Sequence, residues 1–272
     1  MTMYDRNSFN SLGDRMKAYE SAETSRRFIP MVPIYARLDG RSFSKLTKSM
    51  NKPYDVDFSA CMKAACSYLV DKTNANIGYT QSDEISLCWL TESLESEIFF
   101  NGKIFKMTSN LAAMATLAFY LEFQKRFPVS AAKNMPTFDC RIFQVPNKEE
   151  AINCFVWREM DATRNSVSML AQSLFSHKQL DKKGIRSMLD MIHDAGYNWN
   201  DQPTHFKRGT YFQRKTVEKY LTDEELNAIP EKHRPSNPVL RTVVVDLQLE
   251  PILQVSNIEE IIFGDKNDRN KI

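Results

Sequence analysis

The order of the predicted elements is the feature that most limits how this chain of 272 residues can fold. Apolar and β-branched runs predict four strands, and apolar residues at helical spacing predict two helices. The strands are expected at residues 32–40, 76–80, 84–90 and 137–145, and the helices at 55–73 and 109–127. Taken in order they read β-α-β-β-α-β, the ferredoxin-like arrangement. The fold class is therefore predicted as α+β, with additional helices and a C-terminal α/β extension around this core.

This topology brings together two aspartates that are far apart in the sequence. Asp39 ends the first strand and Asp83 begins the third, and these strands are expected to be antiparallel neighbours in the centre of the sheet. Glu84 follows Asp83 directly, and two ionised carboxylates about 4 Å apart repel by roughly 4 kcal/mol at an effective dielectric of 20. A hard cation such as Mg²⁺ relieves that repulsion, and Gly40 would let a ligand approach the backbone. The alternative is that Asp83 and Glu84 are ordinary polar hairpin residues.

The remaining segments are expected to build on this core. Residues 1–145 should form this core together with an N-terminal helix at 9–28. Residues 146–272 should pack on it as one compact unit, beginning with a long helical region at about 147–194. Three further segments are a basic strand-like piece at 206–215, a proline-rich connection at 229–238 and a strand at 241–249.

The composition limits the partners and the compartment. A net charge of +2 neither demands nor excludes a nucleic acid. The five cysteines form no C-x-x-C pair, and none of the four histidines has zinc-ligand spacing, so we expect reduced thiols and no structural zinc. The N-terminus is charged, and the longest apolar stretch is shorter than the roughly 20 residues that a membrane span needs. We therefore expect a soluble cytoplasmic protein with no membrane partner.

Basic residues stand near positions where a triphosphate would need them. Lys103 and Lys106 are three apart, on one face of a helical turn. Lys52 and Asp55 precede the first helix, where capping explains Asp55 equally well. Solvated lysines are the alternative for the basic pair. The carboxylate pair is what favours phosphate chemistry for these residues.

Several blocks of the sequence resemble the signature blocks of tRNA-His guanylyltransferases. They are RLDGRSF (37–43), KPYD (52–55), QSDE (81–84), FDCR (138–141) and RGT (208–210). The N-terminal SLGDRMKAYE is similar to the guanylyltransferase-like branch that repairs tRNA. The resemblance covers most of the chain and implies a polymerase palm-type catalytic domain that extends RNA in the 3′-to-5′ direction. In this family ATP or GTP activates the 5′-monophosphate of a tRNA, and the 3′-hydroxyl of an incoming nucleoside triphosphate attacks the activated phosphate.

The resemblance also implies roles for individual residues. Asp39, the Gly40 carbonyl and Asp83 would hold two Mg²⁺ ions, supported by Glu84, and Lys52 would serve the activation step. The implied nucleotide-binding residues are Gly40, Arg41, Ser42, Phe43, Asp55, Ser82, Lys103, Lys106 and Asn165. The implied partners are tRNA, nucleoside triphosphates and three further copies of the chain, because members of this family are typically tetramers.

Two positions depart from the family pattern. The histidine of a His-Ile-Asn-Asn block is Thr163 here, although Asn165 is kept, and a second family histidine is replaced by Ser44. We therefore favour template-dependent addition to 5′-truncated tRNA, with addition of G to tRNA-His as the alternative. A palm-type nucleotide cyclase would use the same two aspartates. A non-catalytic RNA-binding module is less consistent with residues 84–90, which lack an RNP1-like block.

Overall fold

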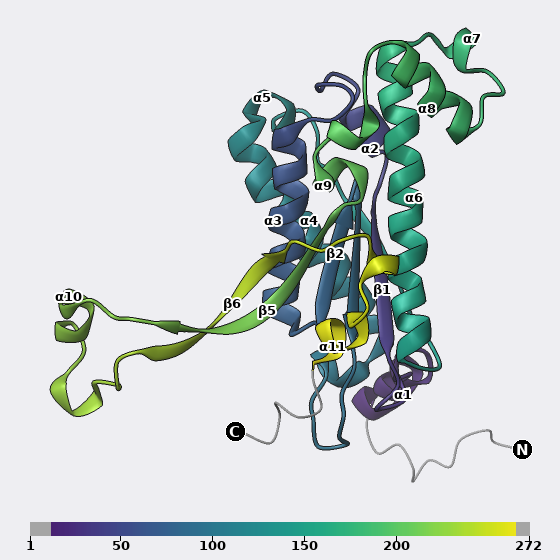
Figure 1. The fold of residues 1–272 in the computed structure, drawn as a ribbon. Helices are drawn as coiled ribbons and strands as arrows, with labels where there is room; N and C mark the ends of the chain where they lie inside the picture. Colours follow the sequence, from purple (N-terminus) through teal and green to yellow (C-terminus); the bar gives the residue numbers. More distant parts are fainter. Residues whose placement is uncertain (1–11, 265–272) are drawn as a thin grey trace, which may run out of the picture.

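Six strands form one antiparallel sheet, in the order β4-β1-β3-β2-β5-β6, in the computed structural model, which describes residues 12–264 (Figure 1). The strands are β1 (Ile34–Gly40), β2 (Ile77–Gln81), β3 (Glu84–Trp89), β4 (Phe138–Gln144), β5 (Thr210–Lys219) and β6 (Val239–Leu247). The predicted α+β class is confirmed. The prediction that the first and third strands are antiparallel neighbours is also confirmed, because β1 pairs with β3 along its length.

Helices cover both faces of the sheet (Figure 1). They are α1 (Leu12–Thr24), α2 (Phe43–Leu46), α3 (Val56–Thr73), α4 (Ile104–Arg126), α5 (Pro128–Ala131), α6 (Lys148–Leu174), α7 (His177–Leu180), α8 (Ile185–Asp194), α9 (Thr204–Lys207), α10 (Asp223–Asn227) and α11 (Ile258–Phe263). α3 and α4 pack on one face, and α6 with α11 packs on the other. The side of the sheet that faces α6 also carries Glu84, which binds Arg158 of that helix.

The alternation of side chains along β1 explains this division. Ala36 and Leu38 join the core under α3 and α4, whereas Tyr35 points to the opposite face and contacts Phe155 of α6. Because successive residues of a strand face opposite sides, Asp39 lies on the same face as Tyr35. The strand therefore presents its terminal carboxylate towards α6.

Several boundaries differ from the expected ones. The helix expected at 109–127 begins at Ile104, and the helix expected at 9–28 is described over Leu12–Thr24, its first residues lying outside the described chain. The region at 147–194 is broken into three helices, because a capping box at Ser176 starts α7 and Gly184 precedes α8. α4 has the length and apolar composition of a membrane-spanning helix, but its buried residues, Phe119 among them, pack into the core.

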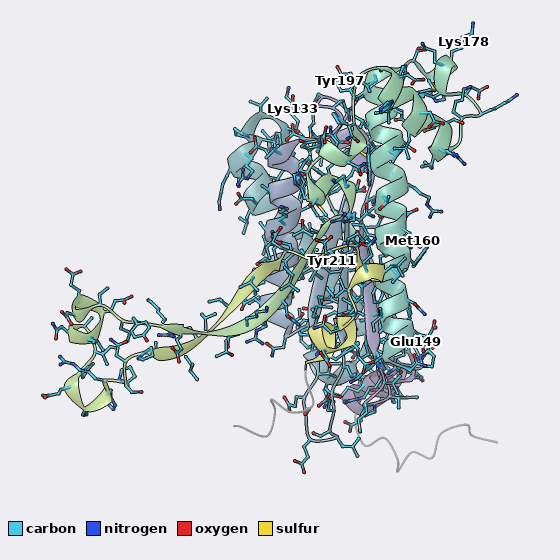
Figure 2. All side chains as sticks on the ribbon, viewed as in Figure 1. Lys133, Glu149, Met160, Lys178, Tyr197 and Tyr211 are labelled. Atoms are coloured by element: carbon cyan, nitrogen blue, oxygen red, sulfur yellow. The ribbon has the colours of Figure 1, made fainter. Side chains whose placement is uncertain are left out.

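The strands β5 and β6 leave the body as a two-stranded arm (Figure 1). Tyr211 lies where the arm joins the sheet, and its ring contacts Tyr79 of β2 (Figure 2). The tip of the arm carries α10 and the connection expected at 229–238, which contains a short helical turn at Glu231–His233. The basic piece expected as a strand at 206–215 is only partly one, since residues 206 and 207 belong to α9.

Candidate active site

Asp39 and Asp83 lie close together where two central strands of the sheet, β1 and β3, end and begin. Asp39 lies opposite Glu84 in the register of β1 and β3, and the backbone N–H of Gly40 donates a hydrogen bond of 3.0 Å to the carbonyl oxygen of Asp83. Ser82 forms the hairpin turn at a positive φ of 47°, and its Oγ donates to Asp83 Oδ1 at 3.2 Å. The fold thus joins residues of two sequence blocks in a single carboxylate site.

The electrostatics of this pair suit a cation. Burial raises the pKa of Asp83 above its ordinary value, and the negative charge of Asp39 raises it further. Residues 12–264 contain no preformed group of three or more His, Cys, Asp and Glu side chains for a metal. Mg²⁺ is commonly held by one or two carboxylates, with water and phosphate oxygens completing the shell. The carboxylates of the two half-buried aspartates are ligands of the kind that such a site uses.

The raised pKa of Asp83 leads to a stability prediction. Its ionisation opposes folding above the raised folded-state pKa, and this cost disappears as the pH falls below the unfolded-state value of about 3.9. In EDTA at pH 7, Asp83→Asn should therefore unfold at a higher urea concentration than the wild-type protein, and the gap should narrow in acid. Mg²⁺ should stabilise only the wild-type protein. An Asp83→Asn variant that is less stable in EDTA at pH 7 would contradict this reading.

Glu84 has a different environment from its neighbour. Its Oε1 accepts a hydrogen bond of 2.7 Å from Arg158 Nε on α6, and Arg37 Nε lies 3.8 Å from its Oε2. Burial raises the pKa of Glu84, and the Arg158 charge partly offsets that effect. We expected a metal to relieve the repulsion between Asp83 and Glu84. The structure shows instead that Arg158 and Arg37 lie beside the Glu84 carboxylate, whereas no ion pair within residues 12–264 involves Asp39 or Asp83.

A cavity of about 220 Å³ adjoins the hairpin. Its lining includes six residues that the sequence implicated, namely Phe43, Lys52, Asp55, Ser82, Asp83 and Asn165, and also Ser44 at a departure from the family pattern. Lys52 lies at the exposed rim, where its Nζ donates to the Thr47 carbonyl at 3.2 Å. Four of the nine predicted nucleotide-binding residues therefore line a single cavity, together with Lys52 and Asp83.

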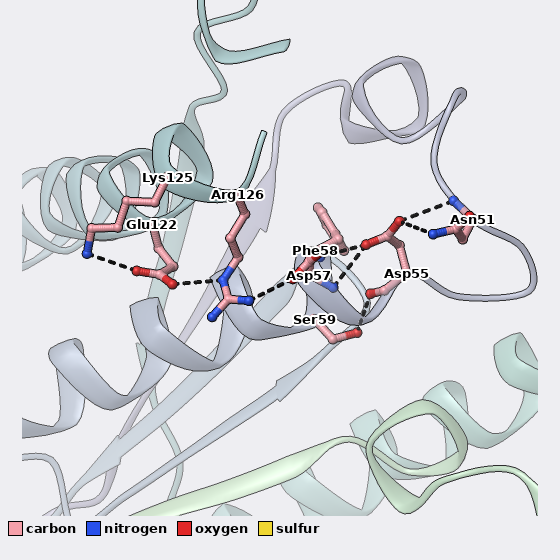
Figure 3. A network of polar contacts seen from close by, with 8 residues as sticks. All are labelled: Asn51, Asp55, Asp57, Phe58, Ser59, Glu122, Lys125 and Arg126. Carbon is pink, nitrogen blue, oxygen red and sulfur yellow. Dashed lines mark hydrogen bonds and ion pairs between the residues drawn. The ribbon is translucent and has the colours of Figure 1, made fainter. Parts of the chain in front are cut away.

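Asp55 acts as the N-cap of α3 (Figure 3). Its Oδ1 accepts from the backbone N–H groups of Asp57 and Phe58, each at 3.0 Å. Its Oδ2 accepts from the backbone and the side-chain amide of Asn51 at 3.2 and 3.0 Å. Each carboxylate oxygen thus already accepts two hydrogen bonds, so the capping explanation accounts for Asp55 within this chain.

The Asp-Gly-Arg-Ser-Phe block has a packing role that the sequence did not reveal. The Phe43 ring is buried against Phe119 and Phe138, and a Cβ added at Gly40 would lie 2.6 Å from that ring. Gly40 therefore leaves room for Phe43, which differs from the expected approach of a ligand to the backbone. Arg41 and Ser42 are exposed beside it.

The predicted lysine pair lies elsewhere. Lys103 is the N-cap of α4 and forms a β-bridge with Arg27, while Arg126, at the far end of α4, donates to Asp57 beside the cavity (Figure 3). A helix of this length spans about 34 Å at 1.5 Å per residue. A single chain therefore does not bring Lys103 and Lys106 to the carboxylate pair.

Sequence reasoning missed several residues of the site. Arg158 occupies a buried position of α6 next to Glu159, and an arginine on the apolar side of an amphipathic helix was the available signal. His205, Tyr54 and Phe206 also line the cavity. Tyr54 lies in the KPYD block, but no local pattern placed it beside His205 and Phe206, which reach it through α9, a helix packed against α6.

Comparison with known proteins decides the family. A family profile described as tRNAHis guanylyltransferase matches residues 13–146. A solved bacterial tRNA(His) guanylyltransferase-like protein in complex with ATP is 36% identical, with a TM-score of 0.70, and the match covers 75% of this chain and 88% of that one. The chain belongs to the tRNA-His guanylyltransferase superfamily. The resemblance seen in the sequence blocks is thereby confirmed.

Other relatives agree with this membership of the guanylyltransferase superfamily. A bacterial guanylyltransferase-like protein in complex with GTP is 28% identical with a TM-score of 0.69, over 93% of this chain and 99% of that one. The tRNA(His) guanylyltransferase of Schizosaccharomyces pombe is 24% identical over 85% of this chain and 91% of its own length. An uncharacterized protein of Acanthamoeba polyphaga mimivirus is 29% identical over 80% of this chain and 81% of its own length. Superfamily members are tRNA guanylyltransferases, so the chain is a nucleotidyltransferase.

Proposed function

We propose that this superfamily member adds nucleotides in the 3′-to-5′ direction, under the direction of a template, to the 5′ end of truncated tRNA. The observation that carries the proposal is the meeting of Asp39 and Asp83 beside a cavity whose lining includes Ser82 and Asn165. Neither aspartate has a cationic side chain bound to it within residues 12–264, whereas Glu84 next to them has two. A divalent cation and a triphosphate would complete this arrangement.

Individual residues of the chain would have distinct roles in the reaction. The carboxylates of Asp39 and Asp83 and the Gly40 carbonyl would hold Mg²⁺, which when bound supplies charge neutralisation at the reacting phosphates. Ser82 would orient the triphosphate at the hairpin, and Lys52 would reach the 5′-phosphate from the rim of the cavity. Glu84, fixed by Arg158, would position the β2–β3 hairpin rather than touch the nucleotide.

In the proposed reaction the 5′-monophosphate of the tRNA first attacks the α-phosphorus of ATP or GTP, and pyrophosphate leaves. The 3′-hydroxyl of the incoming nucleoside triphosphate then attacks the activated 5′-phosphorus and displaces the nucleoside monophosphate. Each step exchanges one P–O bond for another, which is why positioning and charge neutralisation carry most of the catalysis.

Addition of G to tRNA-His is the second candidate function. The curated relatives from S. pombe and Saccharomyces cerevisiae bear that activity in their names, which favours it. Thr163 and Ser44, which replace two family histidines, favour the templated reaction instead. Thr163 Oγ1 donates within its own helix to the Glu159 carbonyl at 3.0 Å, and a hydroxyl engaged in this way cannot stand in for a histidine at a phosphate.

The wider architecture extends this proposal. We propose that β1–β4 with α3 and α4 form a ferredoxin-like palm within residues 1–145, which is supported by the strand order β4-β1-β3-β2. Residues 146–272 would form the extension that carries α6 and the arm. We further propose two Mg²⁺ ions, a homotetramer and a cytoplasmic location. A tetramer could bring Lys103 and Lys106 of one copy to the site of another.

A 5′-extension assay tests the proposed function. The substrate is a 5′-monophosphorylated tRNA that lacks its first nucleotide, supplied with ATP, Mg²⁺ and each labelled nucleoside triphosphate in turn. Addition only of the nucleotide complementary to the opposing acceptor base would support templated polymerisation. Addition of G alone to tRNA-His, whatever base stands opposite, would support the guanylyltransferase reading. A cyclic nucleotide made from ATP or GTP without RNA would refute both.

A further inference from the structure

The wall of the cavity formed by α9 carries a histidine with one unpaired ring nitrogen, as far as the described residues show. His205 lines the cavity, and its Nε2 is buried yet makes no hydrogen bond to any residue within 12–264. A buried polar atom without a partner is unfavourable unless a ligand or water satisfies it. Its position in a cavity beside Ser82 and Asp83 points to a ligand.

The other polar groups of the cavity are largely engaged within the protein. The carboxylate of Asp55 accepts four hydrogen bonds, as described above. Ser166 Oγ donates to the Thr163 carbonyl at 2.8 Å and accepts from Trp199 Nε1 at 3.0 Å. Few polar groups of the cavity therefore remain to read a ligand, and among its described lining residues His205 carries a buried ring nitrogen that lacks a hydrogen-bond partner.

The walls around His205 suit a flat heteroaromatic ring. Tyr54 packs edge-on against His205, with their ring centroids 5.4 Å apart, and the ring centroid of Phe206 lies 4.8 Å from that of Tyr54. Phe58 and Met169 add apolar surface to the same cavity. Aromatic walls with a few convergent polar groups are the usual surroundings of a bound base.

The protonation state of His205 adds a second property. Burial lowers the pKa of this imidazole, and the positive charge of Lys63 lowers it further. The neutral imidazole has one donor nitrogen and one acceptor nitrogen. It can therefore pair with either a carbonyl or an amino group on the edge of a base.

We propose that His205 is a specificity-determining residue, whose Nε2 hydrogen-bonds the base of the nucleoside triphosphate held at Ser82 and Asp83. This assignment rests on the proposed function, since it takes the nucleotide to be the occupant of the cavity. The hydrogen bond to the exocyclic carbonyl or amino group of the base would then contribute to the binding affinity of the triphosphate. Triphosphates whose base lacks such a group should bind more weakly.

Calorimetric titration in Mg²⁺ tests the proposal without requiring a reaction. The dissociation constants of ATP, GTP, CTP, UTP and purine-riboside triphosphate, which lacks the exocyclic group, are compared for the wild-type protein and His205→Leu. The wild-type protein should bind its best purine triphosphate about tenfold or more tightly than the purine-riboside analogue. His205→Leu should reduce that ratio to below about threefold, and His205→Gln should restore part of it.

His193→Leu is the matched control, because His193 is exposed on α8 and does not line the cavity. It should keep the wild-type affinities. An unchanged ranking of nucleotides in folded His205→Leu, or an equal weakening of all five, would refute the assignment of His205 even if the protein extends tRNA. Loss of base discrimination in a protein whose wild-type form extends no tRNA would refute the proposed reaction and leave the assignment standing.

Discussion

Replacing Asp83 by Asn is expected to lower the rate of 5′-nucleotide addition by about 10³-fold or more, and Asp39→Asn should do the same. Each change removes a carboxylate from the pair that would hold Mg²⁺, and the metal's stabilisation of charge in the transition state contributes several kcal/mol. Asn keeps the size of the side chain, so the hairpin and its hydrogen bond to Gly40 should persist. Single-turnover extension of a 5′-truncated tRNA at saturating ATP measures the effect directly.

Asp139→Asn provides the matched control for this loss. Asp139 lies directly opposite Asp39 on β4, where it is exposed and 3.6 Å from Arg141. The substitution removes a negative charge at the same end of the sheet without altering the β2–β3 hairpin. The rate should therefore change by less than about threefold. Full activity of Asp83→Asn, or an equal loss in Asp139→Asn, would show that the carboxylate pair does not have the role assigned to it.

The second large effect concerns stability. Arg158→Met should lower the free energy of unfolding by about 3–5 kcal/mol, because it leaves the Glu84 carboxylate buried without its main counter-charge. The double variant Glu84→Gln/Arg158→Met should recover most of that loss, since the uncompensated charge is then gone. Urea denaturation of the wild-type protein, both single variants and the double variant measures the coupling energy.

Arg164→Met is the control for Arg158. Arg164 also binds Asp161, at 3.0 Å, but its side chain is 57% exposed, so its removal should cost at most about 1 kcal/mol. Equal destabilisation by the two arginine variants would contradict a buried ion pair at Glu84. A double variant as unstable as Arg158→Met would contradict it as well.

The centre of the fold could be predicted because its signals are local. Each of the four core strands showed β-branched or apolar runs, and their order alone placed the first strand next to the third. That inference brought Asp39 to the hairpin at Asp83, which the register of β1 and β3 confirms. The α+β class followed from the same reasoning.

The rest of the site depends on tertiary contacts that leave no local mark. Arg158 reaches Glu84 across 74 positions, and His205 reaches the cavity on α9, which packs against α6. Lys103 and Lys106 were placed at the triphosphate by their spacing, but α4 runs the length of the sheet and begins at its other end. The strand order therefore predicted that Asp39 and Asp83 are neighbours, whereas the spacing of the lysines did not show at which end of the sheet they lie.

Asp39 and Asp83 are proposed to bind the metal that serves the nucleotide. The most direct measurement is the anomalous difference density of a crystal grown with Mn²⁺ and a non-hydrolysable nucleoside triphosphate. Manganese is expected within coordination distance of both carboxylates, with the triphosphate beside Ser82 and no such peak in Asp83→Asn. A nucleotide bound with manganese remote from both aspartates would contradict the account.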